Sequence, residues 1–238
     1  MENFYLTEAI KTKTMLFENI PEFYRRRLPH RQPIGGTFFV TFRLHGSIPP
    51  ARLTALKFQY DLLHQNVLRS QIPDKREQID RLHKRFFRDY DLLMDQAPSD
   101  SPRFLSDPEV RNLVKEQLHR FDGELYDLIC YCIMPNHVHL LIDTRVQIPE
   151  DIHPVNWEGY DFAPLSVIMN RIKGASAYYA NRLLKRTGLP FWQHENYDRV
   201  PRPNGEMGRI IDYILLNPVR AGLVQDWRDY AGNYYCMS

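Results

Sequence analysis

The stretch YDLICYCIMPNHVHLLID, from Tyr126 to Asp143, contains two apolar runs joined by a Met-Pro-Asn segment. The runs are rich in residues that favour strands, and Pro and Asn favour a chain reversal between them. Side chains two residues apart on a strand share a face, so His137 and His139 are expected to point the same way. Two imidazoles on one face form half of a metal site, although partly buried histidines are also common in protein cores.

A second informative stretch is GEMGRIIDYILLNPVRAGLV, from Gly205 to Val224. Pro218 disfavours α geometry at Asn217, which predicts that the helix ends near that residue. Apolar residues recur at the spacing of a helical face that packs on a core, namely Met207, Ile210, Ile211, Ile214 and Leu215.

The other face of this predicted helix is polar. Arg209, Tyr213 and Asn217 follow one another at intervals of four residues, and Arg220 lies about one turn further on. Asn217 can offer an amide oxygen to a cation, with the Tyr213 hydroxyl one turn earlier. The structural alternative is a boundary tyrosine beside an asparagine that ends the helix.

Three motifs in order carry a family resemblance: MPNHVHLL, then FWQHENYDRV (Phe191 to Val200), then IIDYILLNPVRAGLV. They resemble the successive signatures of the REP-associated tyrosine transposases, a branch of the single-strand HUH transposases. The resemblance extends roughly from Gly36 to Trp227. It implies that His137 and His139 bind a metal, that Tyr213 is the nucleophile and that Asn217 is a third ligand. It also implies transfer of single-stranded or hairpin DNA through a covalent phosphotyrosine.

The residue types suit this chemistry. A phenol has a pKa near 10 and is a poor nucleophile at neutral pH unless the developing charge is stabilised, which a cation on the phosphate can do. Two imidazoles and one amide leave coordination positions open, which favours Mg²⁺ or Mn²⁺ over a closed zinc site. Attack by Tyr213 would give a 5′-phosphotyrosine and a 3′-hydroxyl without a nucleotide cofactor, and the sequence contains no Walker-type phosphate loop.

Length and composition predict one elaborated domain over residues 1–238. The chain is 43% apolar and 13% aromatic, enough for a substantial core. No apolar run approaches the roughly 20 residues of a membrane span, and the N-terminus lacks a signal-peptide apolar region, which favours the cytoplasm over a membrane. Cys130, Cys132 and Cys236 are expected to be reduced thiols rather than a disulfide or ligand set.

The formal charge of +2 is too small to indicate nucleic-acid binding by itself, so the distribution of charge matters more. Basic residues crowd one predicted helix, where they form either a phosphate-binding stripe or a solvated face. The candidate DNA contacts are Arg81, Lys84, Arg85, Arg88, Lys173, Arg199 and Arg209. An early basic cluster comprises Arg25, Arg26, Arg27, His30 and Arg31, and a polar loop after the histidine strand holds Asp151, His153 and Glu158.

The order of predicted elements indicates an α+β fold. Strands are expected over Thr37 to Leu44, on either side of the Met-Pro-Asn segment, and over Phe191 to Val200. Helices are expected at about 51–70, 74–94, 108–121 and 164–186, followed by the tyrosine helix. The result is a ferredoxin-like antiparallel sheet with packed helices. Residues at about 71–122 exceed that pattern and are predicted to be an added helical insertion.

Three functions remain open. The first is a metal-dependent single-strand DNA endonuclease and strand transferase, and the second is a domesticated protein that binds hairpin DNA or RNA without cutting. The third is a metal hydrolase in which Tyr213 is only structural, and the lack of an obvious carboxylate base beside the histidines disfavours it. The sequence is compatible with a monomer or a homodimer, and with Tyr213 acting in its own subunit or a partner's.

Overall fold

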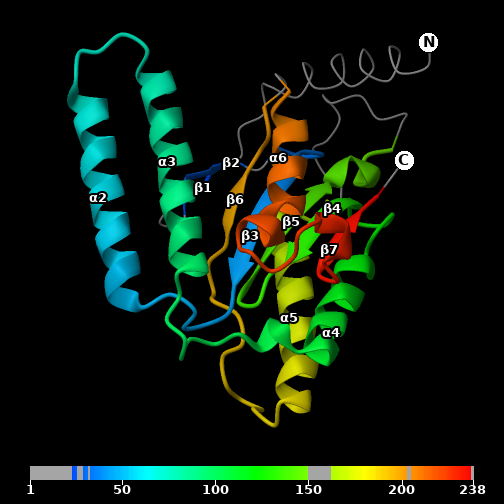
Figure 1. Ribbon diagram of the computed structural model, residues 1–238. Helices are drawn as coiled ribbons and strands as arrows, with labels where there is room; N and C mark the ends of the chain where they lie inside the picture. Colours follow the sequence, from blue (N-terminus) through cyan, green and yellow to red (C-terminus); the bar gives the residue numbers. More distant parts are fainter. Residues whose placement is uncertain (1–22, 26–28, 32, 150–161, 203–204, 237–238) are drawn as a thin grey trace.

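The centre of the structure is a five-stranded antiparallel sheet with the strand order β6-β3-β5-β4-β7 (Figure 1). The strands are β3 (Thr37–Arg43), β4 (Asp127–Ile133), β5 (His137–Asp143), β6 (Tyr197–Arg199) and β7 (Asn233–Tyr235). The first four of them, in the order β6-β3-β5-β4, make the ferredoxin-like arrangement, and β7 extends it beyond β4. The predicted α+β class is confirmed.

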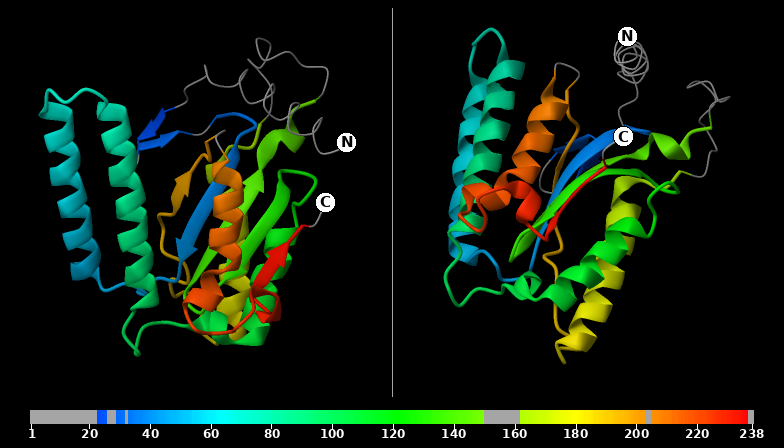
Figure 2. Two further views of the ribbon diagram at one scale, coloured as in Figure 1. Left: turned by 45° about the horizontal axis from the view of Figure 1, so that its top comes forward. Right: turned by 45° about the vertical axis from the view of Figure 1, so that its right-hand side comes forward.

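Helices cover both faces of this sheet. They are α2 (Pro50–Arg69), α3 (Lys75–Asp95), α4 (Pro108–His119), α5 (Leu165–Leu183), α6 (Glu206–Leu215) and the short α7 (Asn217–Arg220). Figure 2 shows α4 and α5 on one face, with α6 and the α2–α3 pair on the other. We call α2 and α3 the accessory hairpin. The predicted insertion at about 71–122 does not coincide with one structural unit, because the accessory hairpin begins before residue 71 and α4 packs with α5. The insertion therefore stays a prediction.

The computed structural model describes residues 23–25, 29–31, 33–149, 162–202 and 205–236. Residues 23–25 and 29–31 form a small antiparallel pair, β1 (Phe23–Arg25) and β2 (Pro29–Arg31). The side chains of the early basic cluster and of the polar loop over 150–161 lie outside the described residues. Within the described part, no helix is long and apolar enough to cross a membrane.

Strand β5 is buried along its whole length because both faces of the sheet are covered. Val138, Leu140 and Ile142 pack in the core shared with α4 and α5. Leu141 packs in the second core, together with residues of α6. His137 and His139 lie on the same side as Leu141, as the alternation of a strand requires. The predicted orientation of the two histidines is therefore confirmed.

The predicted strand over Phe191 to Val200 is regular only at Tyr197–Arg199. Trp192 forms an isolated bridge with Leu44, and its indole nitrogen donates a hydrogen bond to Ser176 Oγ at 2.9 Å. The ammonium of Lys173 holds the carbonyls of Gln193 and His194 at 2.7 and 2.8 Å, so those carbonyls do not continue a ladder. Side-chain anchoring to α5 thus shortened the strand.

The tyrosine helix also differs in one detail from the sequence prediction. Helix α6 ends at Leu215, but α7 starts at Asn217 with Pro218 in its first turn. Proline is tolerated there because the first N–H groups of a helix have no intrahelical partner. The side chain of Asn233 donates to the carbonyl of Leu215 at 2.9 Å and so caps the end of α6.

The start of α6 is tied to β6 by Glu206. Its carboxylate accepts from Arg199 Nη1 at 3.0 Å and from the backbone N–H of Arg202 at 2.9 Å, and its side chain is only 6% exposed. Burial alone would raise the pKa of Glu206, but these hydrogen bonds and the neighbouring positive charges outweigh it, so the pKa is lowered. The ionised carboxylate therefore stabilises the helix that carries Tyr213.

We expect Glu206→Gln to lower the free energy of unfolding by about 1 to 3 kcal/mol at pH 7. A lowered pKa in the folded state contributes stability above the unfolded value, near 4.3, and this contribution is lost as the pH falls through the folded pKa. The difference between the two proteins should therefore shrink at acid pH. Urea unfolding at pH 7 and pH 3.5 measures it, with the exposed Glu124→Gln as control. An equal loss at both pH values would contradict the electrostatic explanation.

Candidate functional site

The two histidines of β5 face each other across a short gap. His137 Nε2 lies 3.1 Å from His139 Nε2, and the side chains are 1% and 0% exposed. Two nitrogens that each lie about 2.0 to 2.1 Å from one cation are about 3 Å apart when the angle between them is near 90°. The spacing therefore fits a pair of nitrogen ligands.

Neighbouring side chains fix the outer nitrogens of both rings. The Asn136 side chain donates through Nδ2 to the carbonyl of Met94 at 2.8 Å, so its oxygen faces His137 Nδ1 at 2.7 Å and accepts from it. This bond leaves His137 Nε2 as the free acceptor. His139 Nδ1 lies 2.8 Å from Thr41 Oγ1, on the adjacent strand β3. Such outer partners orient the imidazoles of metal-binding histidines.

Helix α7 brings the predicted amide to the same place. Asn217 is 3% exposed, and its Nδ2 lies 3.2 Å from His139 Nε2. Its Oδ1 is buried and has no hydrogen-bond partner among the described residues. A buried acceptor without a donor is costly unless another group satisfies it. The amide oxygen is thus available to a cation.

Tyr213 lies beside this cluster, in the same chain. Its ring makes edge contacts with Phe39, Phe87 and His139, with centroids 6.0, 5.5 and 5.3 Å apart. The guanidinium of Arg220 lies 5.4 Å from the ring centroid. Of the three residues that the sequence placed on one ridge with Tyr213, Asn217 and Arg220 adjoin the site, and Arg209 is exposed.

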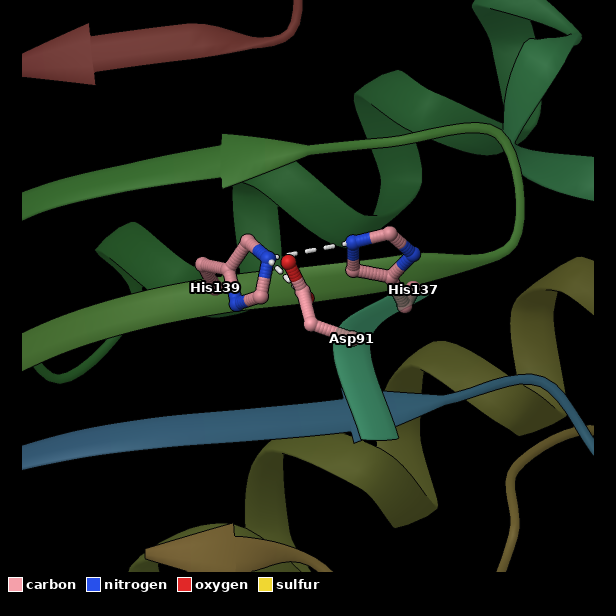
Figure 3. A group of neighbouring side chains, drawn as sticks. All are labelled: Asp91, His137 and His139. Atoms are coloured by element: carbon pink, nitrogen blue, oxygen red, sulfur yellow. Dashed lines mark hydrogen bonds and ion pairs between the residues drawn. The ribbon is translucent and has the colours of Figure 1, made fainter. Parts of the chain in front are cut away.

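An acidic residue that the sequence analysis missed completes the cluster. Asp91, on α3, is 8% exposed, and its Oδ1 lies 3.3 Å from His139 Nε2. Its Oδ2 accepts a hydrogen bond from the hydroxyl of Tyr213. Figure 3 shows the side chain of Asp91 extending from its helix towards the two histidines. Ligand atoms of Asp91, His137 and His139 all lie within 4.8 Å of one another.

The expectation that no carboxylate accompanies the histidine pair was wrong. Proximity in sequence could not indicate Asp91, because it belongs to a helix about 45 residues before His137. One signal was present: Asp91 lies four residues after Phe87 and three before Met94, so it interrupts an apolar helix face. An acidic residue in such a face suggests a buried partner.

The pKa values in this cluster follow from its burial. Burial, helped by the neighbouring His139, lowers the pKa of His137 to about 3, so this imidazole is neutral. Burial would raise the pKa of Asp91, but the neighbouring imidazoles of His139 and His137 and the hydrogen bond from Tyr213 outweigh it and lower the pKa to about 2. Burial and the charge of Asp91 raise the pKa of Tyr213 well above 10. The site thus holds an ionised carboxylate, a neutral imidazole and a protonated phenol at pH 7.

The candidate DNA contacts are scattered and partly engaged within the chain. On α3, Arg81 pairs with Glu77 at 2.5 Å, and Arg85 and Arg88 pair with Asp89 at 3.6 and 3.2 Å. Lys84 and Arg209 are exposed. Arg199 pairs with Glu206, and Lys173 also donates to Asn196 Oδ1 at 2.9 Å. The structure therefore does not gather these side chains into one cluster.

Aromatic side chains can stack on unpaired bases only where they are exposed. Phe191 and Trp192 are core residues, and Tyr197 packs on Phe87 with ring centroids 4.6 Å apart. Tyr178 and Tyr179 on α5 are exposed. Helix α5, which carries them, lies on the face of the sheet opposite α6, the helix of Tyr213 (Figure 2).

Comparison with known proteins agrees with the motifs. A curated protein of Haemophilus influenzae described as a REP-associated tyrosine transposase is 26% identical over 144 residues, which cover 58% of this chain and 73% of that protein. This chain resembles the REP-associated tyrosine transposases. A solved structure of such a transposase bound to a REP hairpin is 16% identical, with a TM-score of 0.43 over 90% of this chain and 82% of the other. No family model matches the chain.

The side chain of Asn136 links the histidine strand to α3, and its loss should weaken the fold. Asn136→Ala would leave the Met94 carbonyl and His137 Nδ1 without their partners in a buried place. We expect a loss of about 2 to 4 kcal/mol in the free energy of unfolding, measured with urea. Asn66→Ala, at an exposed position of α2, is the control and should change stability by less than about 0.5 kcal/mol. Equal stability of the two variants would contradict this linking role.

Proposed function

We propose that the chain is a metal-dependent single-strand DNA endonuclease and strand transferase that acts on hairpin-flanked DNA through a 5′-phosphotyrosine. The observation that carries the proposal is the meeting of Tyr213, Asn217 and the two histidines of β5 in one buried cluster. The similarity to REP-associated tyrosine transposases supports the substrate class. A chain that only binds hairpins has no evident need for this set of groups.

The donor set fits a divalent cation such as Mg²⁺ or Mn²⁺. His137, His139 and Asn217 would hold it, since the imidazole nitrogens already face each other and the amide oxygen of Asn217 has no described partner. Oxygen and nitrogen donors with positions left open suit these ions. When bound, the cation would act as a Lewis acid on the scissile phosphate.

The chain itself supplies the nucleophile. A bond forms between Tyr213 Oη and the phosphorus while the bond from phosphorus to the 3′ oxygen breaks. The phenol loses its proton and the 3′ oxygen gains one, so the products are a 5′-phosphotyrosine and a 3′-hydroxyl. Burial raises the pKa of Tyr213 and keeps the phenol protonated. The positive charge of Arg220 beside the ring opposes this rise. Tyr213 lies beside the histidines of its own chain, which favours attack in cis.

The metal hydrolase remains the second candidate, and Asp91 favours it. A carboxylate beside two histidines could activate a water molecule, with Tyr213 only filling space. The two candidates differ in the fate of the DNA. Strand transfer leaves protein bound covalently to the 5′ end, whereas hydrolysis releases both products.

Tyr213→Phe separates these functions. We expect hairpin binding to persist, and the covalent adduct and the cleavage to fall at least about 10³-fold, the scale on which a lost nucleophile acts. The measurement is a denaturing gel of the protein with labelled single-stranded hairpin DNA and Mn²⁺. Tyr178→Phe, at an exposed position of α5, is the matched control. Cleavage by Tyr213→Phe at the wild-type rate, without an adduct, would support the hydrolase.

Replacing either histidine by alanine tests the metal. His137→Ala and His139→Ala should lose the stimulation of cleavage by Mn²⁺ while keeping most of the affinity for the hairpin, because phosphate contacts dominate DNA affinity. A fluorescence anisotropy titration measures that affinity. Metal stimulation that survives in both variants would remove the histidines from the cation site.

The basic stripe on α3 is proposed as a sequence-independent DNA contact. Replacing Arg81, Lys84, Arg85 and Arg88 by Ala should weaken binding and reduce the log-log salt slope by about 0.7 for each lost contact with a single strand. Because all three arginines of this set have acidic partners on α3, the reduction in slope can be smaller than that for four full contacts. Unchanged affinity and slope would show that the stripe is a solvated face. The control removes four charges on α4, α5 and their ends, namely Arg111, Lys115, Arg120 and Lys185.

A further inference from the structure

The two carboxylate oxygens of Asp91 face different partners. Oδ2 accepts from the Tyr213 hydroxyl. Oδ1 lies 3.3 Å from His139 Nε2, but it is buried and makes no hydrogen bond among the described residues. One carboxylate therefore touches the proposed nucleophile with one oxygen and the histidine pair with the other.

Burial makes the second oxygen costly as it stands. An ionised carboxylate removed from water needs hydrogen bonds or an opposite charge, and an acceptor left without either is expensive. His137 Nδ1 donates to Asn136 Oδ1, so its Nε2 offers only a lone pair towards the gap. Asn217 Oδ1 is a second unpartnered acceptor in the same cluster. A divalent cation between these groups would satisfy both oxygens at once.

Asp91 is held firmly because α3 is anchored on both sides of it. One residue earlier, the hydroxyl of Tyr90 accepts from Arg43 Nε of β3 at 3.1 Å. Three residues later, the carbonyl of Met94 accepts from Asn136 at 2.8 Å. One turn before Asp91, the ring of Phe87 packs between Tyr197 and Tyr213. The accessory hairpin therefore presents this carboxylate in a fixed position.

We propose that Asp91 is a ligand of the cation through Oδ1 and positions Tyr213 through Oδ2. The accessory hairpin thereby completes the active site, in addition to any contact with DNA. The inference rests on the proposed function for its second half, the positioning of the nucleophile. A carboxylate adds a negatively charged oxygen to two imidazoles and an amide, which strengthens the attraction for Mg²⁺ or Mn²⁺. Sharing one rigid carboxylate also fixes the phenol relative to the cation, as in-line attack requires.

The first test measures Mn²⁺ binding to the full chain without DNA, by electron paramagnetic resonance of the free ion. Asp91→Asn keeps the shape but loses the charge, and we expect its Kd for Mn²⁺ to rise at least about 10-fold, because losing a ligand should cost no less than losing an outer partner. Asp61→Asn, an exposed position on α2 of the same hairpin, should stay within twofold of wild type. A wild-type Kd in Asp91→Asn would overturn the ligand role.

A second variant guards against a loss of folding. Asp91→Glu keeps a carboxylate, so it should bind Mn²⁺ more tightly than Asp91→Asn, with circular dichroism reporting the fold of each. A structural role alone would not rank the variants by charge. If Asp91→Glu and Asp91→Asn lose Mn²⁺ equally while both remain folded, the ligand role is overturned.

The second test measures single-turnover formation of the covalent adduct at saturating Mn²⁺ and saturating hairpin DNA. If Asp91 positions Tyr213, Asp91→Asn forms the adduct at least about 10-fold more slowly than wild type under these conditions, with the DNA affinity unchanged. Recovery of the wild-type rate at saturating Mn²⁺ would overturn the positioning role. A wild-type protein that forms no adduct while Asp91→Asn still loses Mn²⁺ would contradict the proposed function and leave the ligand role standing. An active wild type with an unaffected Asp91→Asn would contradict this inference alone.

Discussion

The pairing of β3 with β5 is the constraint on which the rest of the site depends. His139 lies opposite Thr41 and His137 opposite Arg43, so this register supplies the hydroxyl that meets one imidazole. A shift of one residue would turn both histidines towards α4 and α5, and Val138 towards the polar cluster. Burial on both faces makes that shift very costly, because apolar and polar side chains would exchange places. Core packing therefore fixes the register of β3 with β5, and this register determines where the two histidines lie.

Much of the site could be predicted because its groups lie on regular elements. Period two in β5 placed His137 and His139 together, and intervals of four placed Tyr213 and Asn217 on one side of a helix. The helix ends were predicted to within a few residues for α2 and α3. Strand β6 was overestimated because its shortening depends on the contact of Lys173 with distant carbonyls. Local patterns carry no information about such contacts.

Asp91 could not be placed for the same reason. Its helix is separated from β5 by α4 and β4, and only the packing of α3 on the sheet brings its carboxylate to the histidines. The residues that fix this packing, Tyr90 and Met94, bond to Arg43 and to Asn136. Each of these side chains has an unremarkable local context in the sequence. The missing information was therefore the angle at which the accessory hairpin docks, which depends on all of these contacts together.

The cluster combines groups that are unfavourable when buried separately. The charge of Asp91 disfavours a phenolate, so it keeps Tyr213 protonated, while the hydroxyl of Tyr213 in turn stabilises the carboxylate. A neutral His137 and an amide oxygen without a partner add dipoles but no positive charge. Because Arg220 is exposed and lies over the ring of Tyr213 rather than in the cluster, its charge is partly screened by water. The negative charge of Asp91 therefore has no buried positive partner in the space between Asp91, His139 and Asn217. A divalent cation or a proton there is what the surrounding charges favour, and only the cation would also stabilise a phosphate.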